Sequence, residues 1–186
     1  MSQTIVRLGN GDIAPAFATH DVFDQQVQIG GQRDQYVLLS FFRNSACALC
    51  NLRVHQLIER YPQYQAQGLA VIAVFESSQE SIRQYVGKQD APFPIIPDPD
   101  GTLYNLYGVE VSEAKVQATL RHDQTQTIIA QAYEAGFELT EEPGSNFHRI
   151  PADFLLAPDG KIHTAFYAER VGEHLTFELI EKVIGI

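Results

Sequence analysis

The chain has 186 residues, 45% of them hydrophobic, and a formal net charge of −10 at pH 7. These values predict one globular domain over residues 1–186, large enough to bury about 70% of its unfolded surface. The negative charge disfavours anionic partners, so we expect neither nucleic acid nor an anionic membrane to bind. No apolar run approaches the roughly 18 residues of a membrane span, and the first residues lack a signal peptide's apolar segment. We therefore expect a cytoplasmic protein.

The first half of the chain predicts a strand–helix–strand unit. Residues 9–28 indicate a loop with short strands. The next segment, 34–42, is apolar at consecutive positions, which is typical of a strand buried on both faces. Apolar residues then recur on one face of a helix over residues 51–61, and a second buried strand covers 69–75. The two strands should be parallel, with a right-handed crossover.

The second half predicts more helices and two further strands. Ser77 and Glu80 have the spacing of a capping box and should open a helix. The polar stretch 112–135 lacks Gly and Pro and has a weak apolar stripe, which predicts one or two surface helices. The other predicted elements are an extended piece (92–97), a turn and short helix (98–107), an antiparallel strand pair (153–157 and 161–167) and a last helix (176–184) that buries Leu179, Ile180 and Val183. This order predicts an α/β sandwich with a mixed central β-sheet flanked by helices.

The chain contains two cysteines, Cys47 and Cys50, in a C-x-x-C motif between the first buried strand and its helix. A helix N-terminus favours the thiolate through its free N–H groups and its macrodipole. Structural disulfides are rare in the cytosol, so the pair is more plausibly catalytic or metal-binding. A zinc site would need two more ligands, and His20 and His55 do not converge with the pair in sequence. We therefore predict a redox dithiol with no metal and no cofactor, and the alternative is two inert core cysteines.

Four segments of the chain carry a family resemblance. They are residues 11–17 (GDIAPAF), 39–53 with the C-x-x-C, 93–108 and 150–160. In this order they resemble the peroxiredoxin-like subgroup of the thioredoxin superfamily (the alkyl hydroperoxide reductase/thiol-specific antioxidant group) that keeps a C-x-x-C. The resemblance covers most of the chain and implies a thioredoxin-like fold. Residues 112–135 would then be a helical insertion.

The resemblance also implies an activity and a set of site residues. It implies a thiol-disulfide oxidoreductase of antioxidant type that cycles Cys47 and Cys50 between dithiol and disulfide. It implies that Pro151 is the cis-proline beside the dithiol, although spacing alone favours an ordinary trans-proline at a strand entrance. Arg43, four residues before Cys47, is a candidate to stabilise a thiolate, or else a solvated charge at a strand end. Arg149, close to Pro151 in sequence, is a second supporting candidate.

The chain departs from ordinary peroxiredoxins at the positions that bind peroxide. Those proteins carry P-x-x-x-T-x-x-C, in which the Cys is peroxidatic and the Thr hydrogen-bonds the peroxide. If Cys50 is aligned with the peroxidatic position, Cys47 replaces the Thr and Arg43 replaces the Pro. The family's partner arginine would fall near Pro151. Much of the peroxide-binding apparatus is therefore missing.

Three interpretations remain open at this point. In the first, Cys47 attacks a disulfide substrate and Cys50 resolves the intermediate. In the second, the protein is a thiol-dependent peroxidase in which Cys50 is peroxidatic and Cys47 condenses with the sulfenic acid. In the third, it is a non-enzymatic redox sensor or interaction module that changes the surface of residues 112–135. The expected partners are a thiol/disulfide substrate or a peroxide, an external thiol reductant and, in a homodimer, a second copy.

Overall fold

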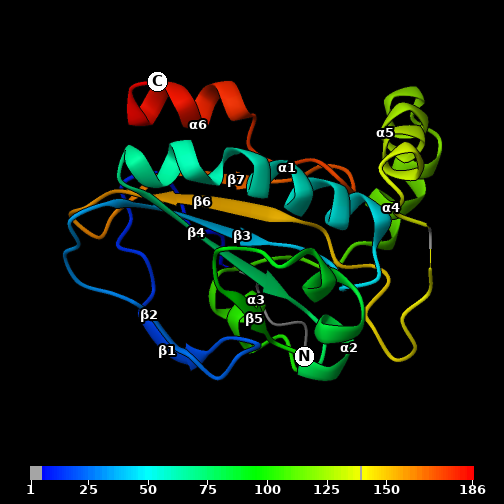
Figure 1. The fold of residues 1–186 in the computed structure, drawn as a ribbon, viewed down its shortest axis with the longest axis horizontal. Helices are drawn as coiled ribbons and strands as arrows, with labels where there is room; N and C mark the ends of the chain where they lie inside the picture. The colour runs from blue at the N-terminus through cyan, green and yellow to red at the C-terminus, as the bar shows by residue number, and fades with distance from the viewer. Residues whose placement is uncertain (1–5, 139) are drawn as a thin grey trace.

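The structure is a computed structural model that describes residues 6–138 and 140–186. At its centre is a mixed five-stranded sheet in the spatial order β5-β4-β3-β6-β7 (Figure 1). Its strands are β3 (Tyr36–Phe41), β4 (Leu69–Phe75), β5 (Ile95–Pro97), β6 (Ala152–Leu156) and β7 (Ile162–Tyr167). Strand β4 is parallel to β3 and β5, whereas β6 is antiparallel to β3 and β7. The predicted mixed central sheet, its β3–β4 parallel pair and its β6–β7 antiparallel pair are confirmed.

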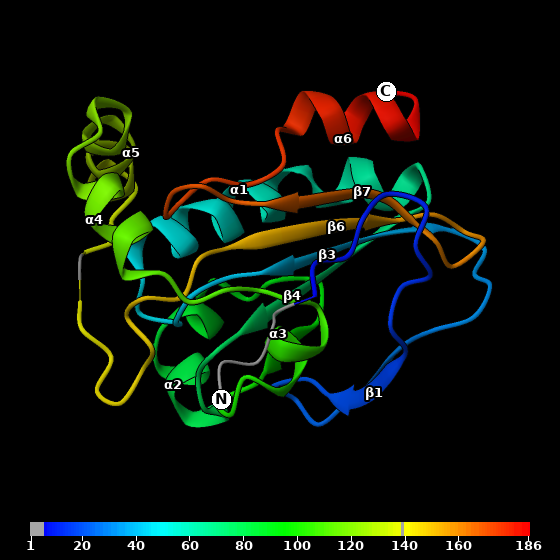
Figure 2. The same cartoon turned by 180° about the vertical axis from the view of Figure 1, so that it is seen from behind.

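Helices and loops cover both faces of this sheet (Figures 1 and 2). Helices α1 (Ala48–Ala66) and α6 (Phe177–Ile184) lie over one face, and α3 (Thr102–Leu106) lies over the other. Successive side chains of a strand point to opposite faces, so Leu38 of β3 joins the core under α1 while Leu39 joins the core near α3. This explains the consecutive apolar residues of β3.

Helix α1 is longer than the predicted range 51–61 at both ends. It begins at Ala48 and continues through Pro62 to Ala66. A proline inside a helix removes one backbone hydrogen bond, which is why the sequence suggests an earlier end. In this helix the turn beyond Pro62 buries Tyr64 completely, and the Tyr64 hydroxyl lies 3.3 Å from Glu181 Oε1. The packing of Tyr64 therefore stabilises the helical turn that follows Pro62.

The stretch 112–135 forms two helices, α4 (Glu113–Leu120) and α5 (Asp123–Glu134). In Figure 1 they stand beside the N-terminal end of α1, at the right of the view. Their apolar stripe is used for this contact, since Val116 and Ala132 are buried in the same core cluster as the α1 side chains. The expected helices are therefore present and lie next to the C-x-x-C end of α1.

Two details of the predicted helices are wrong. The N-cap of α2 (Gln79–Gln84) is Ser78, whose Oγ accepts a hydrogen bond from Ser81 N at 3.1 Å. Ser77 does not cap this helix because its buried hydroxyl is hydrogen-bonded elsewhere, as described below. On α6, Ile180 is buried but Leu179 is 37% exposed. The two residues are adjacent in the chain, so their side chains point to different faces of the helix, and Ile180 is on the face that packs against the core.

The remaining described elements are short. They are the antiparallel pair β1 (Phe17–His20) and β2 (Gln26–Ile29), and a 3₁₀ helix (Val86–Gln89). The pair agrees with the short strands expected within residues 9–28. Within residues 6–138 and 140–186, no helix is long and apolar enough to cross a bilayer.

Candidate redox site

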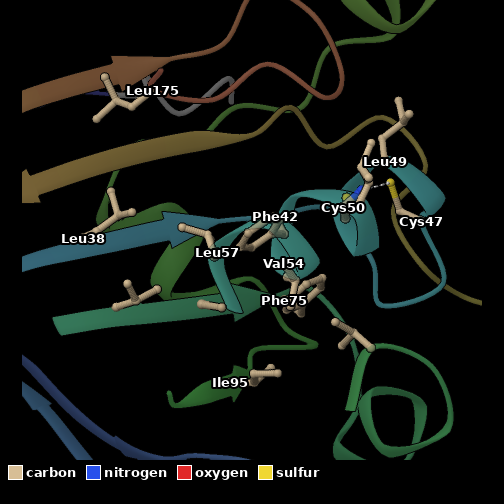
Figure 3. Close-up of a cluster of buried hydrophobic side chains, with 14 of the residues drawn as sticks. Leu38, Phe42, Cys47, Leu49, Cys50, Val54, Leu57, Phe75, Ile95 and Leu175 are labelled. Carbon is tan, nitrogen blue, oxygen red and sulfur yellow. Dashed lines mark hydrogen bonds between the residues drawn. The ribbon is translucent and has the colours of Figure 1, made fainter. Parts of the chain in front are cut away.

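The two cysteines lie where the chain passes from β3 into α1 (Figure 3). Cys47 is the N-cap residue of α1, and Cys50 is in its first turn. The Cys50 N–H donates a hydrogen bond to Cys47 Sγ at 3.4 Å, drawn as a dashed line in Figure 3. The first N–H groups of a helix have no partner within the helix, so a side-chain acceptor at the N-cap satisfies one of them. The helix thus places a hydrogen-bond donor on one sulfur of the pair.

The two sulfurs differ in acidity. The pKa of Cys47 is lowered to about 6, mainly by a hydrogen bond from the Cys50 thiol, against burial and with help from the Arg43 charge and the Cys50 N–H. The pKa of Cys50 is raised well above its ordinary value by burial, by its hydrogen bond to Cys47 and by the Cys47 charge. At neutral pH the reduced pair therefore holds a Cys47 thiolate and a protonated Cys50.

Arg43 lies next to the Cys47 sulfur and is buried, not solvated. Its Nη1 is 3.9 Å from Cys47 Sγ, and the whole residue is 7% exposed. Its Nη2 donates to the Phe147 carbonyl oxygen, and the guanidinium lies 4.9 Å from the centre of the Phe147 ring. Among the described residues, Arg43 has no carboxylate partner within salt-bridge distance. Its charge is consequently available to the thiolate.

A connector, residues 140–149, runs alongside the loop that precedes the cysteines. Three successive residues of that loop each bond to the connector. Arg43 donates to Phe147, Asn44 Nδ2 donates to Ser145 Oγ at 3.2 Å, and Ser45 donates to Glu142. The connector therefore determines where the loop, and with it the Arg43 guanidinium, lies relative to the dithiol.

Glu142 is the centre of this attachment. Its buried Oε2 accepts hydrogen bonds from Ser45 N at 3.0 Å, Ser45 Oγ at 2.8 Å and Ser77 Oγ at 3.0 Å. Sequence analysis does not identify Glu142 as a residue that supports the site. The adjacent Glu141 is exposed, and no local pattern distinguishes the two glutamates.

A cavity of about 680 Å³ adjoins Cys47. Cys47 is 7% exposed and borders this cavity, whereas Cys50 is 1% exposed. The walls come from the first turn of α1, from α4 and α5, and from the connector. The apolar side chains of the lining are Ala48, Leu49, Val116, Leu120, Ile129, Pro143, Phe147 and Val171.

The structure pairs Arg149 with Glu76 and gives Pro151 a trans peptide bond. The Arg149 guanidinium forms a bidentate ion pair with Glu76, at 2.7 and 2.8 Å, and donates to the Val109 carbonyl at 2.7 Å. Among the described residues it makes no hydrogen bond or ion pair with either cysteine, so any support for the site would be indirect. The expectation of a cis-proline is wrong, because the described chain contains no cis peptide bond. Pro151 is a trans-proline before β6, where the missing N–H removes no bond of the strand ladder.

The model of the AhpC/TSA family matches residues 10–165. The chain belongs to the AhpC/TSA family. It is therefore a thiol redox protein, as the resemblance predicts, and the family implies thiol or peroxide substrates. Within the described residues, no three His, Cys, Asp or Glu side chains gather as metal ligands would.

Individual relatives are distant and of two kinds. The thiol-disulfide oxidoreductase ResA of Bacillus thuringiensis is 26% identical over 100 residues, which is 53% of this chain and 57% of ResA. The chain thus spans just over half the length of the ResA proteins it matches. Peroxiredoxin Bcp of Escherichia coli is 22% identical over 164 residues, 88% of both chains. A peroxiredoxin-like protein from Aquifex aeolicus superposes with a TM-score of 0.67 at 13% identity, over 96% of this chain and 87% of that one, which shows the thioredoxin-like fold.

Replacing Arg43 by Gln should raise the pKa of Cys47. The substitution removes the positive charge beside the sulfur, and such a charge lowers the pKa of an acidic group by roughly 1–3 units. The pH dependence of Cys47 alkylation by iodoacetamide, followed by mass spectrometry, measures this pKa. Arg43→Lys keeps the charge and should shift the pKa less than Arg43→Gln. An unchanged profile in Arg43→Gln would exclude the arginine as a thiolate partner.

Replacing Glu142 by Ala should destabilise the fold by about 2 kcal/mol, because the buried hydroxyls of Ser45 and Ser77 lose their acceptor. Urea unfolding measures the change in the free energy of unfolding. Glu141→Ala removes the same charge one residue away on an exposed side chain and should change stability by less than about 0.5 kcal/mol. Equal losses in the two variants would contradict the assigned role of Glu142.

Proposed function

We propose that this protein is a thiol-disulfide oxidoreductase in which Cys47 attacks the substrate and Cys50 resolves the intermediate. The observation that carries the proposal is the difference between the two sulfurs. Cys47 has a pKa of about 6 and borders a cavity, whereas Cys50 is buried and keeps its proton. Thiol–disulfide exchange needs one accessible thiolate and a second thiol held in reserve. In the reduced pair, Cys47 is thus the thiolate and Cys50 the reserve thiol before any substrate binds.

In the first step the Cys47 thiolate attacks one sulfur of a substrate disulfide. A new bond forms between Cys47 Sγ and that sulfur while the substrate's own S–S bond breaks. The second substrate sulfur leaves as a thiolate and takes a proton from solvent. The product is a mixed disulfide on Cys47, and the negative charge beside Arg43 is lost.

The loss of that charge prepares the second step. In the reduced pair, burial raises the pKa of Cys50 most, the hydrogen bond to Cys47 and the Cys47 charge raise it further, and Arg43 lowers it. A mixed disulfide on Cys47 removes its charge and weakens its ability to accept a hydrogen bond, but leaves the Arg43 charge in place. The Cys50 thiol then loses its proton more readily and attacks Cys47 Sγ, which expels the second substrate thiol and closes the 47–50 disulfide. An external thiol reductant returns the pair to the dithiol.

A peroxidase in which Cys50 is peroxidatic has less support in the geometry. Membership of the family and the resemblance to Bcp favour peroxide chemistry in general. A peroxidatic cysteine must, however, be an accessible thiolate, and Cys50 is 1% exposed with a raised pKa. The cytoplasmic location, the homodimer and the sensor role stay predictions.

The two single cysteine variants should fail at different steps. Cys50→Ser keeps the Cys47 nucleophile and should accumulate a stable mixed disulfide at Cys47 when mixed with an aryl disulfide. Cys47→Ser should form such an adduct far more slowly at neutral pH, because the remaining thiol is only 1% exposed and its burial still raises its pKa. Intact-mass spectrometry of the products measures both outcomes.

A control with hydrogen peroxide separates the two enzyme classes. If Cys50 is peroxidatic, Cys47→Ser should oxidise rapidly to a sulfenic acid at Cys50 that dimedone traps. That result, together with no adduct in Cys50→Ser, would overturn the proposed order of the cysteines.

A further inference from the structure

The cavity beside Cys47 has the size of a small-molecule site. Its volume of about 680 Å³ falls in the roughly 300–1,000 Å³ range of ligand pockets in proteins. Cys47 itself is 7% exposed, so a substrate has to enter the cavity to reach the sulfur. This favours a small molecule over a disulfide held in the surface of a folded protein.

Much of the wall opposite α1 belongs to the inserted helices. Val116 and Leu120 come from α4 and Ile129 from α5, and Leu49 of α1 faces the same space. Leu120 is 54% exposed, so its side chain remains largely uncovered. An apolar ligand lying against these side chains would remove that apolar surface from water, which is favourable.

The end of the cavity near the sulfur is polar. Arg43 and Asn44 both line the cavity, and each is more than nine-tenths buried. Among the described residues, Arg43 Nε and Asn44 Oδ1 have no hydrogen-bond partner. Buried polar atoms in folded proteins are nearly always paired. Arg43 Nε–H is a donor and Asn44 Oδ1 is an acceptor, so only the arginine would pair with a hydrogen-bond acceptor on a ligand. A hydrogen-bond acceptor on the ligand, close to its disulfide, would pair with the guanidinium.

From these observations we propose that the cavity binds a low-molecular-weight disulfide with a mostly apolar body and a hydrogen-bond acceptor near its S–S bond. Helices α4 and α5 supply the apolar wall, and Arg43 supplies the polar contact beside Cys47. The proposal names the substrate class of the oxidoreductase proposed above and rests on that function. The reaction itself is the exchange already described, with the apolar thiol as the leaving group.

The test is a single substitution in the apolar wall. Leu120→Asp places a charge in the lining, and the exposure of Leu120 lets the fold tolerate it. The rate at which Cys47 reacts with dithiodipyridine, a small aromatic disulfide with acceptor nitrogens, should fall about tenfold. The rate with hydroxyethyl disulfide, which is small and polar, should stay within about twofold, since it gains little from an apolar wall.

Tyr133→Asp is the matched control. Tyr133 lies on α5, is 50% exposed and stands outside the described lining of the cavity. It should leave both rates unchanged. Ile129→Asp is a second wall variant and should repeat the selective loss.

A binding measurement keeps this proposal separate from the proposed function. Dipyridyl sulfide, an unreactive analogue with one sulfur, should bind the wild-type protein and bind Leu120→Asp about tenfold more weakly, by calorimetry. Such binding without any disulfide exchange would support the proposed ligand site and overturn the proposed oxidoreductase function.

Disulfide exchange that is equally fast in Leu120→Asp and Tyr133→Asp would overturn the proposed ligand site and leave the oxidoreductase function standing. A third outcome is that Cys47 reacts faster with cumene hydroperoxide than with dithiodipyridine, at a rate that falls in Leu120→Asp. That result would overturn the proposal that the cavity binds a disulfide.

Discussion

The site depends on a single negative charge on Cys47 Sγ. Three donors hold it: the Cys50 thiol, the Cys50 N–H at the start of α1 and the Arg43 guanidinium. Each is delivered by a different part of the fold. The helix supplies the N–H, the two-residue spacing supplies the thiol, and the loop after β3 supplies the arginine. A buried thiolate without these donors would be protonated at neutral pH, because burial alone raises a thiol's pKa.

The sheet and the connector hold the loop after β3, and with it Arg43, in place beside the cysteines. Strand β3 pairs on both edges and is buried on both faces, so the loop that follows it starts from a rigid point. The connector then bonds to Arg43, Asn44 and Ser45 in succession. The same connector and the inserted helices enclose the cavity at Cys47. The connector therefore both positions the arginine that stabilises the thiolate and forms part of the cavity wall.

Much of the architecture could be predicted from the sequence because it depends on local patterns. Consecutive apolar residues mark β3 and β4, and the C-x-x-C between strand and helix marks the redox pair. Predictions fail where a distant contact overrides the local signal. Helix α1 continues beyond Pro62 because Tyr64 packs in the core. Ser77 does not cap α2 because its hydroxyl donates a hydrogen bond to Glu142. The cis-proline fails because it came from the resemblance and from no property of the residues themselves.

The sequence by itself determined that two thiols stand one helical turn apart at the start of a helix, since this needs only neighbours along the chain. Only the tertiary structure decided which thiol is the thiolate and what surrounds it. The Arg43 contact with Phe147 joins residues 104 positions apart, and the Ser45 contact with Glu142 joins residues 97 apart. Burial, which raises the pKa of Cys50, likewise depends on segments that meet only in the fold. No local pattern can encode a pKa set by such contacts.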